Sequence, residues 1–157
     1  IGSLWNIETV CLRIFNTYGP NQQLPPTHPP VIPYFLKQAH ENATIVIHGD
    51  GNQTRDYIYI DDVVTGMIAA ATATSVNRST INIGSGRETS VSEIARLVVS
   101  LTGNRPEIVR NVRNEGGPNR LCADISLARE KLNFSPRTPL EIGLQLTYEN
   151  DPRIKQK

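Results

Sequence analysis

The chain has 157 residues, which suits one domain of ordinary size with room for a substantial core. Its 16 basic and 15 acidic residues leave a net charge of +1 and form no basic run. This balance indicates neither nucleic acid nor a membrane as the main partner, and it leaves an anionic small molecule open. No apolar stretch approaches the ~20 residues that a bilayer requires.

The two cysteines, Cys11 and Cys122, lie far apart and outside any metal-ligand spacing. With no signal peptide in view, we interpret them as reduced thiols in the core of a cytosolic protein. The chain begins with Ile1 rather than Met and reaches a strand almost at once, which indicates a piece of something longer.

The first part of the chain predicts a buried strand, an irregular loop and a helix. Residues 9–15 form a near-continuous apolar run, and residues 16–20 form a turn-rich exit of the kind where ligands bind in α/β sheets. Residues 20–30 hold five of the eleven prolines and are either a lid or a plain connection. From Val31 to Ala39, apolar residues recur at helical spacing.

The stretch from Gly49 to Asp62 joins a tight turn, a strand and the start of a helix without spacer residues. The β-branched run 45–47 and the alternating run 56–60 are predicted to pair across this glycine-bearing loop as a hairpin. Arg55 would leave the turn of that hairpin in a position to direct its guanidinium at an anion.

Two adjacent carboxylates, Asp61 and Asp62, precede apolar residues at helical spacing. We expect them to cap a helix over residues 61–73, and capping is favoured over acid–base chemistry. Either carboxylate, or that of Asp56, could instead pair with Arg55 on a solvated surface, which is the alternative to anion binding.

The second half of the chain alternates strands and helices. It first predicts a strand over residues 80–83, then a helix that begins with the capping box 90–93 and ends at Gly103. A strand over residues 107–112 and a polar loop over residues 113–120 follow. The chain ends with a short helix capped by Asp124 and a last helix that begins with the capping box 138–141, with Pro139 at its first position. The whole pattern predicts a mixed α/β fold with few short strands and about five helices. The strands are too few for a complete doubly wound sheet.

The remaining motifs carry little chemistry. Residues 84–86, Gly-Ser-Gly, begin like a dinucleotide fingerprint, but the third glycine is missing and the helix opens later, so a plain strand-to-helix turn is favoured. His28, His40 and His48 show no metal spacing, and no Ser-His-Asp triad can be nominated. We expect each histidine to be structural or exposed.

Four groups of residues do form a recognisable set, in order along the chain: 13–20, 49–63, 82–86, and 123–126 with 139–144. Together they resemble the C-terminal half of the NAD-dependent nucleotide-sugar epimerase/dehydratase family. This is the extended branch of the short-chain dehydrogenases/reductases, which includes UDP-glucose 4-epimerase. The resemblance covers nearly the whole chain and is specific for the family, but not for the member.

In that family a glycine-rich unit binds NAD, and the tyrosine of a Tyr-x-x-x-Lys pair takes a proton from a sugar hydroxyl while hydride passes to NAD. No tyrosine of this chain is followed four positions later by lysine. The resemblance therefore implies that residues 1–157 are the substrate-binding C-terminal portion of an isomerase or lyase, without the N-terminal dinucleotide-binding sheet and inactive alone. Residues 1–20 would be the last part of the Rossmann sheet, and the full-length enzyme would be a homodimer.

The resemblance also assigns site residues for a nucleotide-diphosphate sugar and for NAD. For the diphosphate they are Asn16, Arg55 and either Arg113 or Arg120; for the base, Ile32, Val46 and His48; and for the nicotinamide, Phe15. A guanidinium fork suits phosphate oxygens. His48 departs from the aromatic residue often found at its position, which leaves the base preference open.

A second hypothesis is a stand-alone nucleotide-binding or regulatory module that kept the fold and lost the chemistry. The sugar, the base and the choice between epimerisation, dehydration and decarboxylation stay open at this point.

Overall fold

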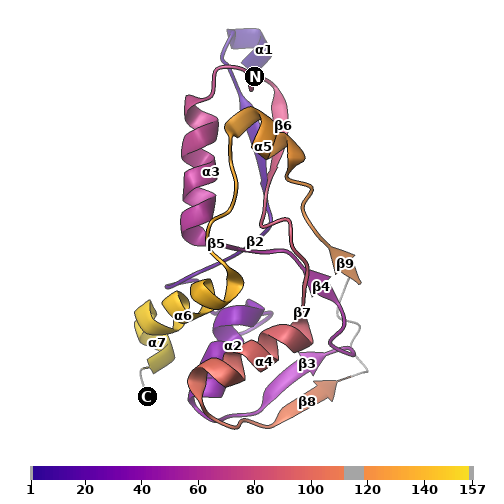
Figure 1. The fold of residues 1–157 in the computed structure, drawn as a ribbon, viewed down its shortest axis with the longest axis vertical. Coiled ribbons are helices and arrows are strands. Elements are labelled where there is room, and N and C mark those ends of the chain that lie inside the picture. Colours follow the sequence, from indigo (N-terminus) through magenta and orange to yellow (C-terminus); the bar gives the residue numbers. More distant parts are fainter. Residues whose placement is uncertain (1, 112–118, 156–157) are drawn as a thin grey trace.

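The computed structural model describes residues 2–111 and 119–155 and confirms a mixed α/β fold. Two packed parts follow one another along the long axis of the molecule (Figure 1). The upper part holds α1 (Gly2–Trp5), β1 (Val10–Ile14), α3 (Ile60–Thr72), β6 (Ser79–Ile83) and α5 (Ser126–Leu132). The lower part holds α2 (Val31–His40), β3 (Ile45–His48), α4 (Val91–Thr102), β8 (Ile108–Asn111), α6 (Leu140–Asn150) and α7 (Pro152–Lys155). Short strands lie between them: β2 (Asn16–Tyr18), β4 (Thr54–Arg55), β5 (Tyr57–Tyr59), β7 (Thr89–Ser90) and β9 (Arg120–Leu121).

The helices predicted from local signals are confirmed. In α4, the Ser90 hydroxyl accepts a hydrogen bond from the N–H of Glu93 at 3.1 Å, and Gly103 ends the helix with φ of 69°. In α2, Pro33 lies in the first turn, where a missing N–H costs nothing. The carboxylate of Asp124 binds the N–H of Ser126, the first residue of α5, at 2.9 Å, although Ile125 holds the cap position.

The predicted hairpin is wrong. Strand β3 pairs in parallel with β8, and strand β5 pairs in parallel with β2, so neighbours in sequence are not neighbours in a sheet. The loop between them turns at Gly49 and Gly51, both with positive φ, and is held by α4, because the Gly51 carbonyl accepts from the N–H of Ser92 at 3.0 Å. This contact directs the chain away from β3 instead of back along it.

The predicted caps of α3 and α6 are also wrong. Helix α3 begins at Ile60, one residue earlier than expected, which places Asp61 and Asp62 in its first turn, where the helix dipole favours negative charge. The buried Asp62 carboxylate instead accepts hydrogen bonds from the N–H groups of Arg137, at 2.9 Å, and Thr138, at 3.0 Å. Residues 138–141 therefore form no capping box, and Asp62 ties the segment before α6 to α3.

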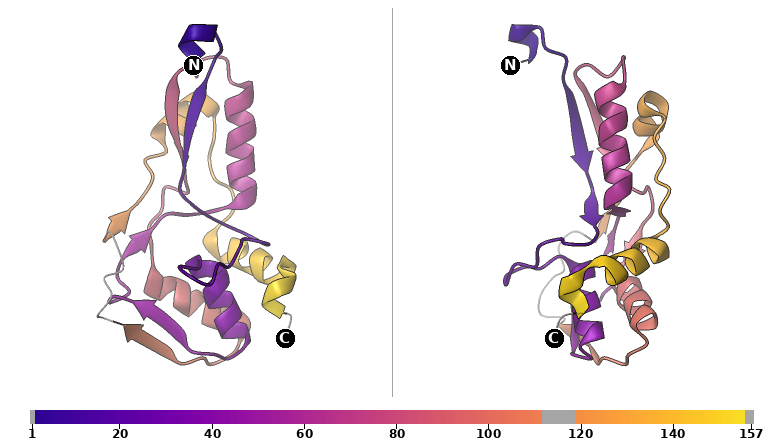
Figure 2. Two further views of the ribbon diagram at one scale, coloured as in Figure 1. Left: turned by 180° about the vertical axis from the view of Figure 1, so that it is seen from behind. Right: turned by 90° about the vertical axis from the view of Figure 1, so that its left-hand side faces the viewer.

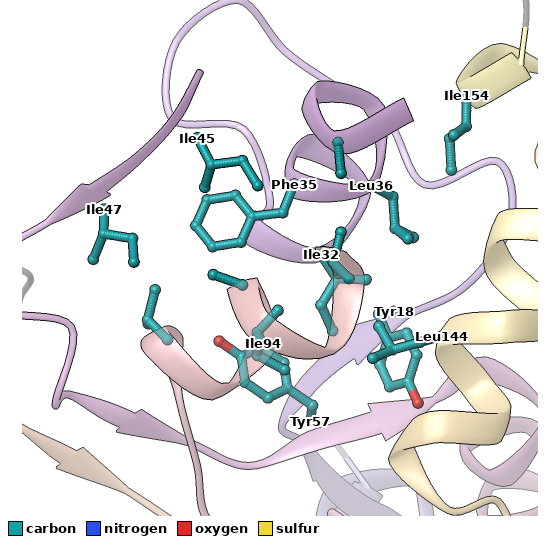
Figure 3. Close-up of a cluster of buried hydrophobic side chains, with 14 of the residues drawn as sticks. Tyr18, Ile32, Phe35, Leu36, Ile45, Ile47, Tyr57, Ile94, Leu144 and Ile154 are labelled. Atoms are coloured by element: carbon teal, nitrogen blue, oxygen red, sulfur yellow. The ribbon is translucent and has the colours of Figure 1, made fainter. Parts of the chain in front are cut away.

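Two hydrophobic clusters hold the two parts. The lower cluster joins α2, α4, β3 and α6, with Phe35 and Ile94 at its centre (Figure 3). Tyr18 packs against α6 at Gly143, where an added Cβ would collide with the phenol oxygen. The upper cluster joins α3, β6 and α5 around Ile81 and Phe134.

Strand β1 is less buried than its apolar sequence predicts. Within the described residues it pairs only with β6, and Cys11 and Ile14 are exposed. Cys122 is half-buried, so the prediction that both cysteines lie in the core is wrong. The right-hand view in Figure 2 shows β1 and α1 at the margin of the upper part. None of the described helices is long and apolar enough to cross a membrane.

Apolar side chains are exposed on α1 and on one face of α3. Trp5 is 73% exposed, Met67 50% and Ile68 61%. On α3, Val64, Met67 and Ile68 lie on one helix face, and contiguous apolar surface of this kind marks an interaction site or promotes aggregation. Together with the open edge of β1, it gives the upper part a surface suited to association.

We therefore expect the 157-residue chain to self-associate as its concentration rises, as measured by sedimentation velocity. Replacing Met67→Glu together with Ile68→Lys should lower the association, because the apolar contact is lost. Ile142→Lys, at a 49% exposed position on α6, is the matched control and should leave it unchanged. A monodisperse monomer at high concentration would contradict this prediction.

Candidate functional site: a cleft beside β2 and β4

An open cleft of about 1220 Å³ lies against the short strands between the two parts. It is large enough for a small-molecule ligand. Its walls come from β2, the proline-rich loop, α2, β3, the segment around β4, and the start of α4: Asn16, Thr17, Tyr18, Gln22, Pro26, His28, Pro29, Pro30, Val31, Ile32, Tyr34, Phe35, Val46, His48, Gln53, Arg55, Tyr57 and Val91. The proline-rich segment, which the sequence left as a lid or a connection, is a wall of this cleft.

Five of the residues assigned from the resemblance line this cleft together: Asn16, Ile32, Val46, His48 and Arg55. They come from β2, α2, β3 and β4, which are far apart in sequence. Their exposure differs, because Asn16 and His48 are exposed, whereas Ile32 is 1% exposed and belongs mainly to the lower cluster (Figure 3).

Phe15 and Arg120, the other two assigned residues that the structure describes, are not among the residues that line the cleft. Phe15 is half-buried between β1 and β2 and packs against the upper cluster. Arg113 lies outside the described residues. Arg120 is exposed on β9, where its guanidinium forms an ion pair with Glu88.

The two described arginines of this set lie on opposite faces of β4. Arg120 is in register with Thr54, and both side chains bind the Glu88 carboxylate, Thr54 at 3.1 Å. Because successive side chains of a strand point to opposite faces, Arg55 faces the other way, towards the cleft. The hydrogen bond from Arg120 lowers the pKa of Glu88, so that carboxylate is ionised at neutral pH.

Asp56, whose burial the sequence analysis did not predict, is 0% exposed. One carboxylate oxygen accepts from the N–H of Ser85 at 2.7 Å and from its hydroxyl at 2.6 Å. The other accepts from the N–H groups of Gly86, at 2.9 Å, and Ala123, at 3.1 Å. The available signal was a charged residue inside an aromatic and aliphatic strand run, which predicts a buried, hydrogen-bonded carboxylate.

Asp56 also sets the position of the polar side chains in the cleft. Its main-chain carbonyl accepts from the N–H of Asn16 at 3.2 Å and from the Asn16 amide at 3.1 Å. This holds Asn16 next to Arg55, whose guanidinium binds the carbonyl of Thr54 at 2.8 Å. Since Asp56 and Asp62 direct their carboxylates to main-chain N–H groups, neither forms the surface pair with Arg55 that the sequence left open.

The turn at residues 84–86 is confirmed as a plain strand-to-helix connection. The N–H groups of Ser85 and Gly86, which a phosphate loop would offer to a nucleotide, point at Asp56. The Asp56 carboxylate therefore takes the position that a bound phosphate would take in a phosphate loop.

Two glutamine side chains of the cleft are held by neighbouring main-chain atoms. Gln53 donates to the carbonyl of His48 at 2.6 Å, and Gln22 donates to the carbonyl of Thr17 at 3.0 Å. The side-chain oxygen of Gln22 is buried and has no hydrogen-bond donor within the described part of the chain. Burial raises the pKa of Tyr57 to about 12, so its phenol is neutral at ordinary pH.

The arrangement is suited to binding an anion that carries a planar or apolar group. Arg55 and Asn16 supply donors at one side, and apolar and aromatic side chains such as Val46 and Tyr57 supply the other walls. Among the described residues, no group of three or more His, Cys, Asp or Glu side chains could hold a metal ion.

Comparison with known proteins places these features in a family. Residues 2–84, more than half of the chain, match the NAD dependent epimerase/dehydratase family. The chain belongs to this family. Its membership explains why the motif around Arg55 and the Asn16 turn occur in the same chain.

Individual members of the epimerase/dehydratase family cover almost the whole chain. UDP-glucuronic acid decarboxylase 1 of Xenopus tropicalis is 33% identical over 90% of this chain and 32% of its own length. The crystal structure of UDP-glucose 4-epimerase of Thermotoga maritima with UDP-glucose is 33% identical, with a TM-score of 0.87, over 95% of this chain and 47% of that one. The UDP-glucuronic acid 4-epimerase of Bacillus cereus, in complex with UDP-glucuronic acid and NAD, is 33% identical, with a TM-score of 0.86, over 99% and 48%. The chain thus spans less than half of the length of each of these relatives.

Replacing Asp56→Asn should lower the free energy of unfolding by about 2–4 kcal/mol, because the amide brings an N–H group against main-chain donors and leaves them unsatisfied. Urea unfolding followed by circular dichroism measures the loss. Asp61→Asn, on the exposed side of the first turn of α3, is the matched control and should change stability by less than about 0.5 kcal/mol. Equal stability of the two variants would show that the Asp56 contacts contribute little.

Proposed function

We propose that this chain is the nucleotide-diphosphate-sugar-binding portion of an NAD-dependent sugar epimerase, dehydratase or decarboxylase. The observation that carries the proposal is the single cleft that brings together Asn16, Ile32, Val46, His48 and Arg55. The residues come from separate segments of the chain, and the resemblance assigns all five to one ligand.

In this proposal Arg55 clamps the diphosphate. Its planar guanidinium can donate two parallel hydrogen bonds to phosphate oxygens, and Asn16 adds an amide donor beside it. The position of Arg55 at the cleft supports this role, as does the Asp56 carbonyl that holds Asn16 next to it. Arg120 is paired with Glu88 on the other face of β4, so Arg55 is the better candidate for contact with the diphosphate.

The base would lie against the apolar wall that includes Ile32 and Val46, with His48 at its edge. Similar solved structures support a uridine nucleotide, because their complexes contain UDP-glucose or UDP-glucuronic acid. Titration with nucleotides that carry uracil, thymine or guanine identifies the base.

The proposed whole enzyme also uses NAD, which would accept and return a hydride at the sugar ring. Of the described residues, Phe15 is our candidate for contact with the nicotinamide. Its half-buried ring does not line the cleft, but it directly precedes Asn16, which does, and this position next to the site supports the assignment. Residues 1–20 would then be the last part of the Rossmann sheet of a cytosolic, homodimeric enzyme.

Isothermal titration of the 157-residue chain with UDP, dTDP and GDP tests the binding role. We expect one of them to bind, and Arg55→Ala to weaken that binding about 100-fold, because a charge-assisted bidentate contact is lost. Arg120→Ala should have a much smaller effect, and Arg96→Ala, which removes an exposed charge on α4, should have none. Absence of binding to all three nucleotides, in a folded sample, would refute the proposal.

We further expect the chain to show no NAD-dependent turnover of UDP-glucose or UDP-glucuronic acid, because it contains no Tyr-x-x-x-Lys pair to exchange the hydroxyl proton. The assay follows NADH absorbance and the sugar product by chromatography. Turnover by the purified chain would overturn the view that it is catalytically incomplete.

A further inference from the structure

One wall of the cleft has no regular secondary structure of its own. Residues 22–30 form no helix or strand, and they contribute Gln22, Pro26, His28, Pro29 and Pro30 to the lining. Proline stiffens such a segment locally but does not fix it relative to the rest of the protein. Its position must therefore come from contacts made elsewhere.

The beginning of this loop is held by Asp151 and Arg153, at the far end of the sequence. The Asp151 carboxylate, in a residue that is 1% exposed, accepts from the N–H of Asn21 at 2.9 Å. The Arg153 guanidinium donates to the carbonyl of Gln22 at 2.7 Å. The two side chains thus bind the N–H of one loop residue and the carbonyl of the next.

Asp151 and Arg153 also bind each other. The Arg153 fork donates Nε to one carboxylate oxygen at 2.9 Å and Nη2 to the other at 2.7 Å, and the Arg153 N–H adds a third bond at 3.1 Å. These bonds lower the pKa of Asp151, which keeps the carboxylate ionised. Ile154, which is 0% exposed, anchors α7 in the lower cluster beside α2 (Figure 3).

The held segment leads directly to the cleft. The side chain of Gln22 donates to the carbonyl of Thr17 in β2, the strand that carries Asn16. A continuous set of hydrogen bonds therefore runs from Arg153 through Gln22 to the strand beside Arg55. A loop that is already ordered does not have to be ordered when a ligand binds, and this lowers the free-energy cost of binding.

We propose that Asp151 and Arg153 are positioning residues that hold the proline-rich loop as a wall of the nucleotide site. The inference rests on the proposed function of the cleft, and neither side chain touches the ligand itself. It makes the C-terminal α7 a part of the binding apparatus, although α7 lies outside the cleft.

The test uses the 157-residue chain with Arg153→Ala and, separately, Asp151→Asn. UDP affinity is measured by calorimetry, amide exchange of residues 21–30 by mass spectrometry, and stability by urea unfolding. We expect about tenfold weaker UDP binding by the folded protein and at least about tenfold faster exchange in the loop. The unfolding midpoint should also fall, because each change breaks the contacts of a buried carboxylate, so affinity is measured without denaturant on folded samples. Arg153→Lys keeps the charge but loses the fork, and should restore affinity only in part.

Arg96→Ala is the matched control for the loss of one positive charge in the lower part, and should change neither affinity nor loop exchange. Unchanged UDP affinity in both Arg153→Ala and Asp151→Asn would overturn the inference, even if the loop exchanges faster. A lower unfolding midpoint with unchanged affinity of the folded protein would show a structural role only, and would overturn it as well. Failure of the unaltered chain to bind UDP, dTDP or GDP would instead refute the proposed function, and loop exchange then shows separately whether the pair orders the loop.

Discussion

The buried carboxylate of Asp56 is the constraint on which the rest of the structure depends. A carboxyl group with no exposure to water is tolerated only when hydrogen-bond donors surround it, because a buried polar group without hydrogen bonds otherwise costs several kcal/mol. Donors from Ser85, Gly86 and Ala123 meet this requirement, and each comes from a different stretch of chain than Asp56 itself. The segment around Arg55 is consequently joined to both the β6 exit and the segment before α5, at the boundary between the two hydrophobic clusters.

The positions of the helices, which depend mainly on neighbours in sequence, were predicted well, although the caps of α3 and α6 were not. The cap of α4 needs only Ser90, Glu93 and Gly103, which lie within one helix length, and the helix was located correctly. Strand partners were not predicted, because β3 pairs with β8 across more than sixty residues and nothing local specifies that choice. The carboxylate of Asp62 shows the same limit, since capping chemistry identifies an acceptor but does not identify Arg137 and Thr138 as its donors.

The candidate site was also predicted only in part. Family resemblance supplied five residues that line the cleft, Arg55 and Asn16 among them, because motifs preserve which residues belong together without showing how they meet. It did not supply the loop that begins at Gln22 or its contacts with Asp151 and Arg153, which have no motif in common with the rest of the site. The salt-bridged pair near the C-terminus becomes informative only when its tertiary contacts are known.

The parallel strand pairs determine how fast this chain can fold. Asn16 meets Tyr57, Val10 meets Ser79, and Ile45 meets Ile108, so each of these ladders closes a long stretch of intervening chain. Loop-closure entropy must be lost before such contacts stabilise anything, and folding rates fall as the mean sequence separation of contacts rises. Helices α2, α3 and α4 can form early, but the cleft cannot exist until the last strands have docked. Refolding should therefore be slow for a chain of this length, and its intermediates would present unpaired strand edges to one another.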